Sequence, residues 1–178
     1  MAKFKVEPKS RDDLRQLAKQ IRIQLGIEDI LYFPADRILE IIHKIDSEAH
    51  FEVVDKSELN EGDFATTDVI SKTIKIRSDI YDKACMGDPF ARMVIVHEFA
   101  HFITINVYGF ELAMNIGKRK IPAYEDPEWQ AKCLAGELMM PFDKIKGMSY
   151  KDIEQKCGVT RQAVVTHFRG KPLNLFFK

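Results

Sequence analysis

The sequence predicts an α+β fold that is mostly helical, with a small sheet of three strands. Apolar residues recur at helical spacing in several segments, and two short segments alternate in polarity or are β-branched, as strands are. The length of 178 residues corresponds to one ordinary domain, or to a core with a small appendage. We expect the sheet to be antiparallel and to lie between helices.

The first two helices are predicted over residues 10–25 and 35–45. Ser10, with Asp13 three residues later, resembles a capping box, and Gly26 ends the first apolar repeat. The pattern then changes from helix to strand, which places the small sheet after this helix pair.

Three segments are candidates for the strands. Residues 50–54 and 73–77 alternate in polarity or are β-branched, and residues 64–70 could supply a third strand. An exposed edge of such a sheet can accept a further strand, and residues 73–77 are the candidate for that edge.

Two longer helices are predicted in the second half of the chain. The Asp-Pro pairs at 88–89 and 126–127 each place a capping Asp before a Pro at the first helical position. The first helix is expected to run to about residue 108 and the second to about residue 140. Residues 110–125 between them are expected to form a loop or a short irregular segment.

The C-terminal segment is predicted to contain two short helices joined by a turn at Gly158, like a helix-turn-helix. Ser149 and Thr160 are the expected caps, and Arg161 and Gln162 open the second helix, where base contacts would lie in a DNA-binding protein. However, Lys+Arg and Asp+Glu both number 27, so the chain has no net charge to attract nucleic acid. We therefore expect the tail to pack on the core or to contact a partner protein, without binding DNA.

This interpretation divides the chain into a core at 1–141 and a C-terminal helical subdomain at 142–178 that packs on it. The cysteines are too few and too irregularly spaced for a disulfide framework, which fits a reducing compartment. No segment approaches the roughly 18 uninterrupted apolar residues of a membrane span, and the N-terminus opens no long apolar run. We expect a soluble, cytoplasmic protein that does not associate with membranes.

Residues 97–101 read His-Glu-Phe-Ala-His and predict a metal site on a helix. His97 and His101 are four residues apart, so both imidazoles leave the same face and can reach one metal ion. Glu98 cannot comfortably join them as a ligand and would instead act as a general base on the open side of the metal. The surrounding residues are apolar on nearly all sides, so this helix should be central and its ionisable groups need a partner.

A catalytic zinc usually has three protein ligands and one open position, so another element should supply the third. The acidic candidates downstream are Glu111, Glu125, Asp126, Glu128 and Glu137. Glu128 is favoured because it lies in the first turn of the next helix, whereas Glu137 faces about the opposite side of that helix. Zinc fits these ligands, and manganese or iron could also occupy such a site.

Two blocks of the chain carry a resemblance to a known family. Residues 92–101 read Arg-Met-Val-Ile-Val-His-Glu-Phe-Ala-His, and residues 128–141 read Glu-Trp-Gln-Ala-Lys-Cys-Leu-Ala-Gly-Glu-Leu-Met-Met-Pro. Together they resemble the ImmA/IrrE family of bacterial and phage metallopeptidases, in which a His-Glu-x-x-His helix precedes a Glu-x-x-Ala helix with a Leu-Met-Pro-like end. Lys132 and Leu134 stand where the family often has Asn and Phe, and we expect neither to touch the chemistry directly.

The resemblance implies a zincin-like fold and a zinc endopeptidase. His97, His101 and Glu128 would be the zinc ligands, and Glu98 would be the catalytic base. The substrate would be a protein, typically a helix-turn-helix repressor encoded nearby, whose cleavage derepresses mobile-element or stress genes. The similarity extends more weakly over most of the chain.

Other interpretations remain open at this point. One is a non-catalytic, metal-stabilised module that binds a repressor or DNA, and another is a metal-dependent hydrolase of a non-peptide substrate. An oxyanion donor is expected without being assigned, and the candidates are Tyr108, Tyr124, Arg161 and His167. The basic run at 118–120 is expected to be a solvated loop.

Overall fold

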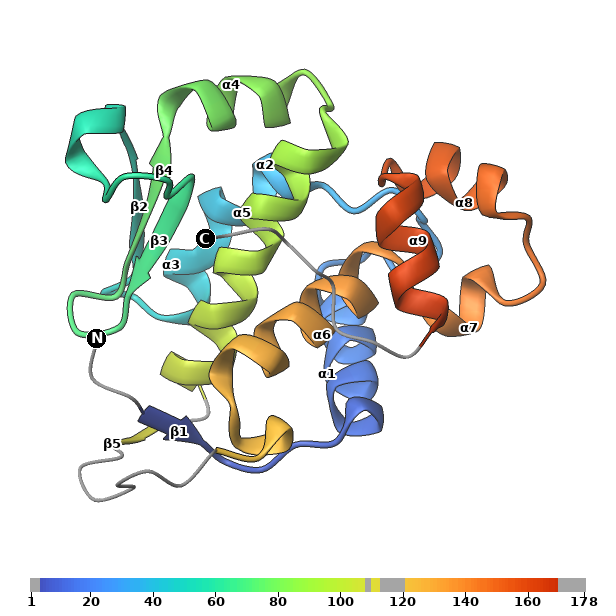
Figure 1. Cartoon of the computed structure of the whole chain (residues 1–178), viewed down its shortest axis with the longest axis horizontal. Helices are drawn as coiled ribbons and strands as arrows, with labels where there is room; N and C mark the ends of the chain where they lie inside the picture. Colours follow the sequence, from blue (N-terminus) through green and yellow to red (C-terminus); the bar gives the residue numbers. More distant parts are fainter. Residues whose placement is uncertain (1–3, 108–109, 113–120, 170–178) are drawn as a thin grey trace.

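Helices make up most of this α+β fold, and a small three-stranded sheet lies at one side of them (Figure 1). The computed structural model describes residues 4–107, 110–112 and 121–169. The helices and helical turns are α1 (Arg11–Gln24), α2 (Ala35–Ile38), η1 (Leu39–Ile41), α3 (Ile42–Ile45), η2 (Lys56–Glu58), α4 (Ser78–Cys85), α5 (Pro89–Phe102), η3 (Ile103–Val107), η4 (Ala123–Glu125), α6 (Pro127–Met139), α7 (Phe142–Ile145), α8 (Tyr150–Cys157) and α9 (Arg161–Phe168). The strands are β1 (Phe4–Val6), β2 (His50–Val54), β3 (Ala65–Asp68), β4 (Thr73–Arg77) and β5 (Phe110–Leu112).

The three-stranded sheet has the order β2-β4-β3 and is mixed. β3 and β4 form an antiparallel hairpin, whereas β2 runs parallel to β4 on its other side. The expectation of an antiparallel sheet is therefore wrong for one of the two pairs, because alternation of side chains specifies a face and not a strand direction. The proposal of residues 73–77 as an edge is also wrong, since β4 is the central strand and β2 and β3 are the edges.

Several elements differ from the sequence-based expectation. The predicted second helix is interrupted by the 3-10 turn η1, which separates α2 from α3. The helix α4 follows β4 directly and was not predicted, nor were α7 and the short pair of β1 with β5. The segment expected as a loop at 110–125 thus contains β5 and η4, while residues 113–120, including the basic run, lie outside the described residues.

The helix α5 occupies the centre of the molecule, as its apolar sequence predicted. Asp88 caps it by accepting a hydrogen bond from the backbone N–H of Ala91, and Pro89 is its first residue. All ten residues from Ala91 to Ala100 are buried. The chain continues as the π-helical turn η3 where a longer α-helix was expected, and a single such turn often lies near a functional site.

The buried side chain of Arg92 connects α5 to the C-terminal helices. Its guanidinium donates to the carbonyl oxygen of Phe33 at 2.8 Å and to the carbonyls of Cys157 and Gly158, and it lies 3.7 Å over the ring of Tyr32. These contacts fix the turn between α8 and α9 against the core. Figure 1 shows α7, α8 and α9 grouped on one side of the molecule. The division at residue 141 stays a prediction.

None of the helices in the described part of the chain is both long enough and apolar enough to cross a bilayer.

Candidate metal centre

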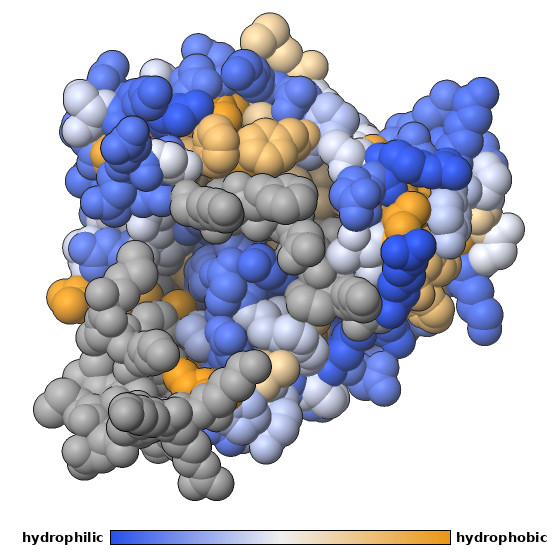
Figure 2. Space-filling view, in the orientation of Figure 1, coloured by the Kyte–Doolittle hydropathy of each residue, from blue (hydrophilic) through white to orange (hydrophobic). Residues whose placement is uncertain are grey.

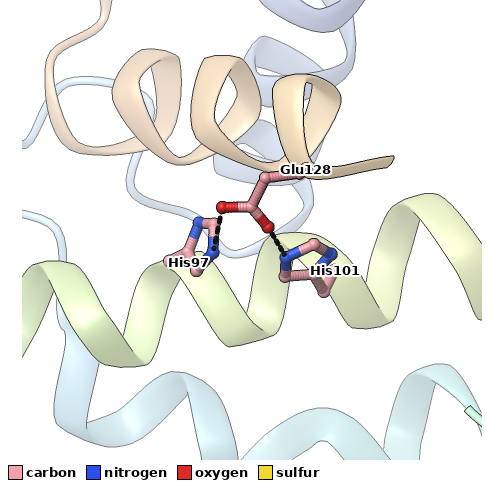
Figure 3. A group of neighbouring side chains, drawn as sticks. All are labelled: His97, His101 and Glu128. Atoms are coloured by element: carbon pink, nitrogen blue, oxygen red, sulfur yellow. Dashed lines mark hydrogen bonds and ion pairs between the residues drawn. The ribbon is translucent and has the colours of Figure 1, made fainter. Parts of the chain in front are cut away.

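Two helices bring together the three predicted ligands (Figure 3). His97 and His101 project from one face of α5, and Glu128 projects toward them from the first turn of α6. One ligand atom of each residue lies within 4.8 Å of those of the other two, so the group could hold a metal ion. The position of Glu128 follows from the start of α6, where the side chain of Asp126 accepts from the backbone N–H of Glu128 at 2.9 Å.

The spacing of the ligand atoms suits a small divalent cation. Nε2 of His101 is 3.0 Å from Oε2 of Glu128, and Nε2 of His97 is 3.6 Å from Oε1 of the same carboxylate. Tetrahedral coordination at 2.0–2.2 Å separates ligand atoms by roughly 3.3–3.6 Å. The two imidazole rings are nearly perpendicular, at 79°, with centroids 4.6 Å apart. Small shifts of the side chains would therefore admit a metal.

The electrostatics of His97 and Glu128 also favour ligation. Burial lowers the pKa of His97, because the charged imidazolium loses its hydration. Burial alone would raise the pKa of Glu128, but its hydrogen bonds with His101 and His97 outweigh that effect and hold its pKa below the usual range. A neutral imidazole and a charged carboxylate are the forms that bind a metal.

Glu98 lies beside this group and is held by a residue of the sheet. It is buried, and its Oε2 accepts a hydrogen bond of 2.7 Å from Oγ1 of Thr67 in β3. Among the described residues the group that could hold a metal does not include Glu98, and its role as a base stays a prediction. Thr67 was missed in the sequence, where it lies 31 residues from Glu98 and belongs to no motif.

A second contact at the site concerns Lys132. Its Nζ lies 2.9 Å from Oε1 of Glu128, one helical turn away on α6. Lys132 therefore contacts a candidate ligand, while the expectation that it does not take part directly in the chemistry stays a prediction. The spacing carried a usable signal, because a Glu and a Lys four residues apart on a helix face each other.

The other acidic candidates have different roles or positions. Glu137 is buried on another side of α6, as its helical position predicted. Arg11 and Arg15 pair with it there. Asp126 serves as the N-cap of α6. Glu125 belongs to η4, and the side chain of Glu111 lies outside the described part.

The candidate oxyanion donors gain no support as a group. Arg161 pairs with Glu154 at 2.8 Å, and His167 is buried next to Glu137. Tyr124 lies in η4 and is 49% exposed, while residue 108 lies outside the described residues. The oxyanion donor therefore stays unassigned.

Figure 2 shows hydrophilic surface in the middle of the face on which α5 and α6 lie in Figure 1.

Neither the models of known protein families nor the curated protein sequences contain a match to this chain.

Proposed function

We propose that this chain is a zinc-dependent endopeptidase. The observation that carries the proposal is the convergence of His97, His101 and Glu128 from two helices, with the carboxylate of Glu98 beside them and outside the ligand group. Structural zinc sites usually have four protein ligands, whereas catalytic sites have three and keep one position open. A three-residue set next to a candidate base supports catalysis over a purely structural metal.

The residues of this chain have separate roles in the proposed reaction. A zinc ion, when bound, would supply a Lewis acid that acidifies water and polarises a carbonyl group. The carboxylate of Glu98 would accept a proton from the attacking water, and would then give that proton to the leaving amine. Since Oε2 of Glu98 accepts from Thr67, Oε1 is the oxygen that we assign to this proton transfer.

We further infer membership of the ImmA/IrrE family and a helix-turn-helix repressor as the substrate. The support is the pair of sequence blocks at 92–101 and 128–141, together with the observed order of a His-Glu-x-x-His helix and a helix with Glu128 in its first turn. The substrate class rests on the resemblance alone, and a cytoplasmic location would follow from such a substrate.

The test is to coexpress the chain with helix-turn-helix repressors encoded beside it, and to compare wild type with Glu98→Gln. We expect the wild type to cleave a repressor and Glu98→Gln to lose at least about a hundredfold in rate, because proton transfer contributes that much or more. Both proteins should carry one zinc ion, measured by elemental analysis, because Glu98 is not a ligand.

Three outcomes would contradict the proposal in different ways. Cleavage that persists in Glu98→Gln would remove this residue from catalysis. A wild-type chain that binds no zinc would remove the metal site. A repressor that binds the zinc-loaded protein and is never cut would favour the non-catalytic regulatory module.

A further inference from the structure

Lys132 places a positive charge directly beside a predicted metal ligand. Its ammonium lies 2.9 Å from Oε1 of Glu128, the carboxylate oxygen that also faces Nε2 of His97 at 3.6 Å. Only 18% of the lysine side chain is exposed, so this charge is partly shielded from solvent. In the part of the chain that the structure describes, no other Lys or Arg forms an ion pair with Glu128.

The charges of the site explain what this lysine does. In the form that binds a metal both imidazoles are neutral, so the ligand set then has only the charge of the Glu128 carboxylate, which the ammonium of Lys132 cancels. We propose that Lys132 is an internal counter-ion of the metal centre: it neutralises Glu128 when no metal is bound, and it weakens metal binding. The inference rests on the metal site of the proposed function. A divalent cation placed among these ligands would lie close to the ammonium, and like charges in a partly buried site repel.

The alternative is that Lys132 merely orients the carboxylate for the metal, in which case its loss would weaken binding. The contacts of Glu128 favour the first role. Its backbone is fixed by the cap at Asp126, and its Oε2 already lies 3.0 Å from Nε2 of His101. The carboxylate therefore keeps its direction toward the histidines without the lysine. Repulsion between the ammonium and the metal ion is then a larger effect of Lys132 than orientation of the carboxylate.

The experiment measures zinc affinity by competition with a chromophoric chelator at pH 7.5. We expect Lys132→Met to bind zinc at least tenfold more tightly than wild type, which corresponds to about 1.4 kcal/mol. Lys132→Arg keeps the charge and should stay within about threefold of wild type. The difference between Lys132→Met and wild type should narrow as salt is raised, because salt screens the ammonium.

Two further variants serve as controls. Lys144→Met removes an ion pair of 2.7 Å with Asp29 that includes no ligand, and it should leave zinc affinity unchanged. Lys132→Gln provides a second neutral side chain, with the same tightening expected, in case the methionine variant folds poorly.

The outcomes separate this inference from the proposed function. If wild type binds zinc and both neutral variants bind it equally well or more weakly, Lys132 is no internal counter-ion and the endopeptidase proposal is untouched. If wild type binds no zinc at all, the metal site and the proposed function fail together.

Discussion

The two carboxylate oxygens of Glu98 have different surroundings, and this matters for a base. Oε2 accepts the hydroxyl hydrogen of Thr67 at 2.7 Å, and the same hydroxyl lies 3.1 Å from the backbone carbonyl oxygen of Glu98. A hydroxyl has a single hydrogen to donate, and the shorter contact to the charged oxygen is the stronger one. Thr67 thus restricts the side chain of Glu98 to one orientation.

This contact predicts a specific effect of Thr67→Val, which removes the hydroxyl and nearly preserves the volume. A hydrogen bond to a charged group contributes about 1.5–3 kcal/mol, so we expect the cleavage rate to fall at least about tenfold. Zinc content should not change, since Thr67 contacts no ligand in the described structure. The measurements are the rate of repressor cleavage and the zinc content of the purified protein.

Thr67→Ser is the matched control for this prediction, because it keeps the hydroxyl and should restore most of the rate. Equal activity in the valine variant and the wild type would show that Thr67 does not position the base.

The residues of the candidate centre could be predicted in part. His97, His101 and Glu128 were named from helical spacing, from capping and from resemblance, and the fold brings them together. Thr67 could not be named, because its contact depends on how the sheet packs on α5. Lys132 could have been named, since the Glu and the Lys are one turn apart on the same helix.

Whole elements also differ in whether a local signal in the sequence predicts them. The helices that begin with a side-chain cap were predicted from the sequence, namely α1, α5, α6, α8 and α9. The α-helices without such a cap, namely α2, α3, α4 and α7, were merged or missed, and the 3-10 turn η2 was missed although Asp55 caps it. A cap is a local signal, whereas strand direction and the pairing of β1 with β5 depend on distant parts of the chain.

The turn between α8 and α9 allows a prediction at the scale of an element. Gly158 ends α8 with φ of 61°, in the left-handed region. A Cβ at this position would collide with the guanidinium of Arg92 and lie 2.5 Å from Cε2 of Tyr32. Gly26 after α1 has a similar φ of 68°, but a Cβ there would meet no atom within 4 Å. Comparing an alanine substitution at Gly26 with one at Gly158 therefore separates the cost of the left-handed backbone conformation from the cost of the steric clash.

We expect Gly26→Ala to lower the free energy of unfolding by about 1 kcal/mol, the backbone cost alone. Gly158→Ala should lower it by about 3 kcal/mol, because the new methyl group also displaces Arg92 from its carbonyl partners. Urea unfolding of the two variants and wild type measures both values. Equal losses would show that the contacts of Arg92 do not constrain this turn.

At the scale of the molecule, a buried ionic cluster joins three helices that are far apart in the sequence. Glu137 of α6 pairs with Arg15 at 3.1 Å and Arg11 at 3.3 Å, both from α1. His167 of α9 lies 3.1 Å from the guanidinium of Arg11 through Nδ1 and 4.0 Å from Glu137 through Nε2. The cluster therefore connects the C-terminal helices to the rest of the fold.

This cluster predicts acid sensitivity of the fold. Burial is the main reason that the pKa of His167 is lowered from 6.5 to about 4. The positive charges of Arg11 and Arg15 also lower this pKa, whereas the negative charge of Glu137 raises it. The unfolded chain therefore binds a proton that the folded chain does not between pH 6.5 and 4, so stability falls as pH falls through this window. We expect His167 to account for a loss of about 2 kcal/mol between pH 7.5 and pH 5.

Urea unfolding at the two pH values, with a chelator present, measures this loss for wild type and for His167→Gln. The glutamine variant cannot take up the proton and should lose about 2 kcal/mol less than wild type. A pH dependence that is the same in both proteins would show that His167 does not titrate as described.

The complete burial of α5 from Ala91 to Ala100 has a consequence for how this protein can diverge. The helix that presents the two histidines also lies at the centre of the hydrophobic core, so a change at almost any position on it alters stability together with the site. Selection for a new specificity would have to act on the half-buried edges, such as β3 around Thr67 and the first turns of α6 around Lys132. A library restricted to those edges should yield folded variants far more often than one directed at α5.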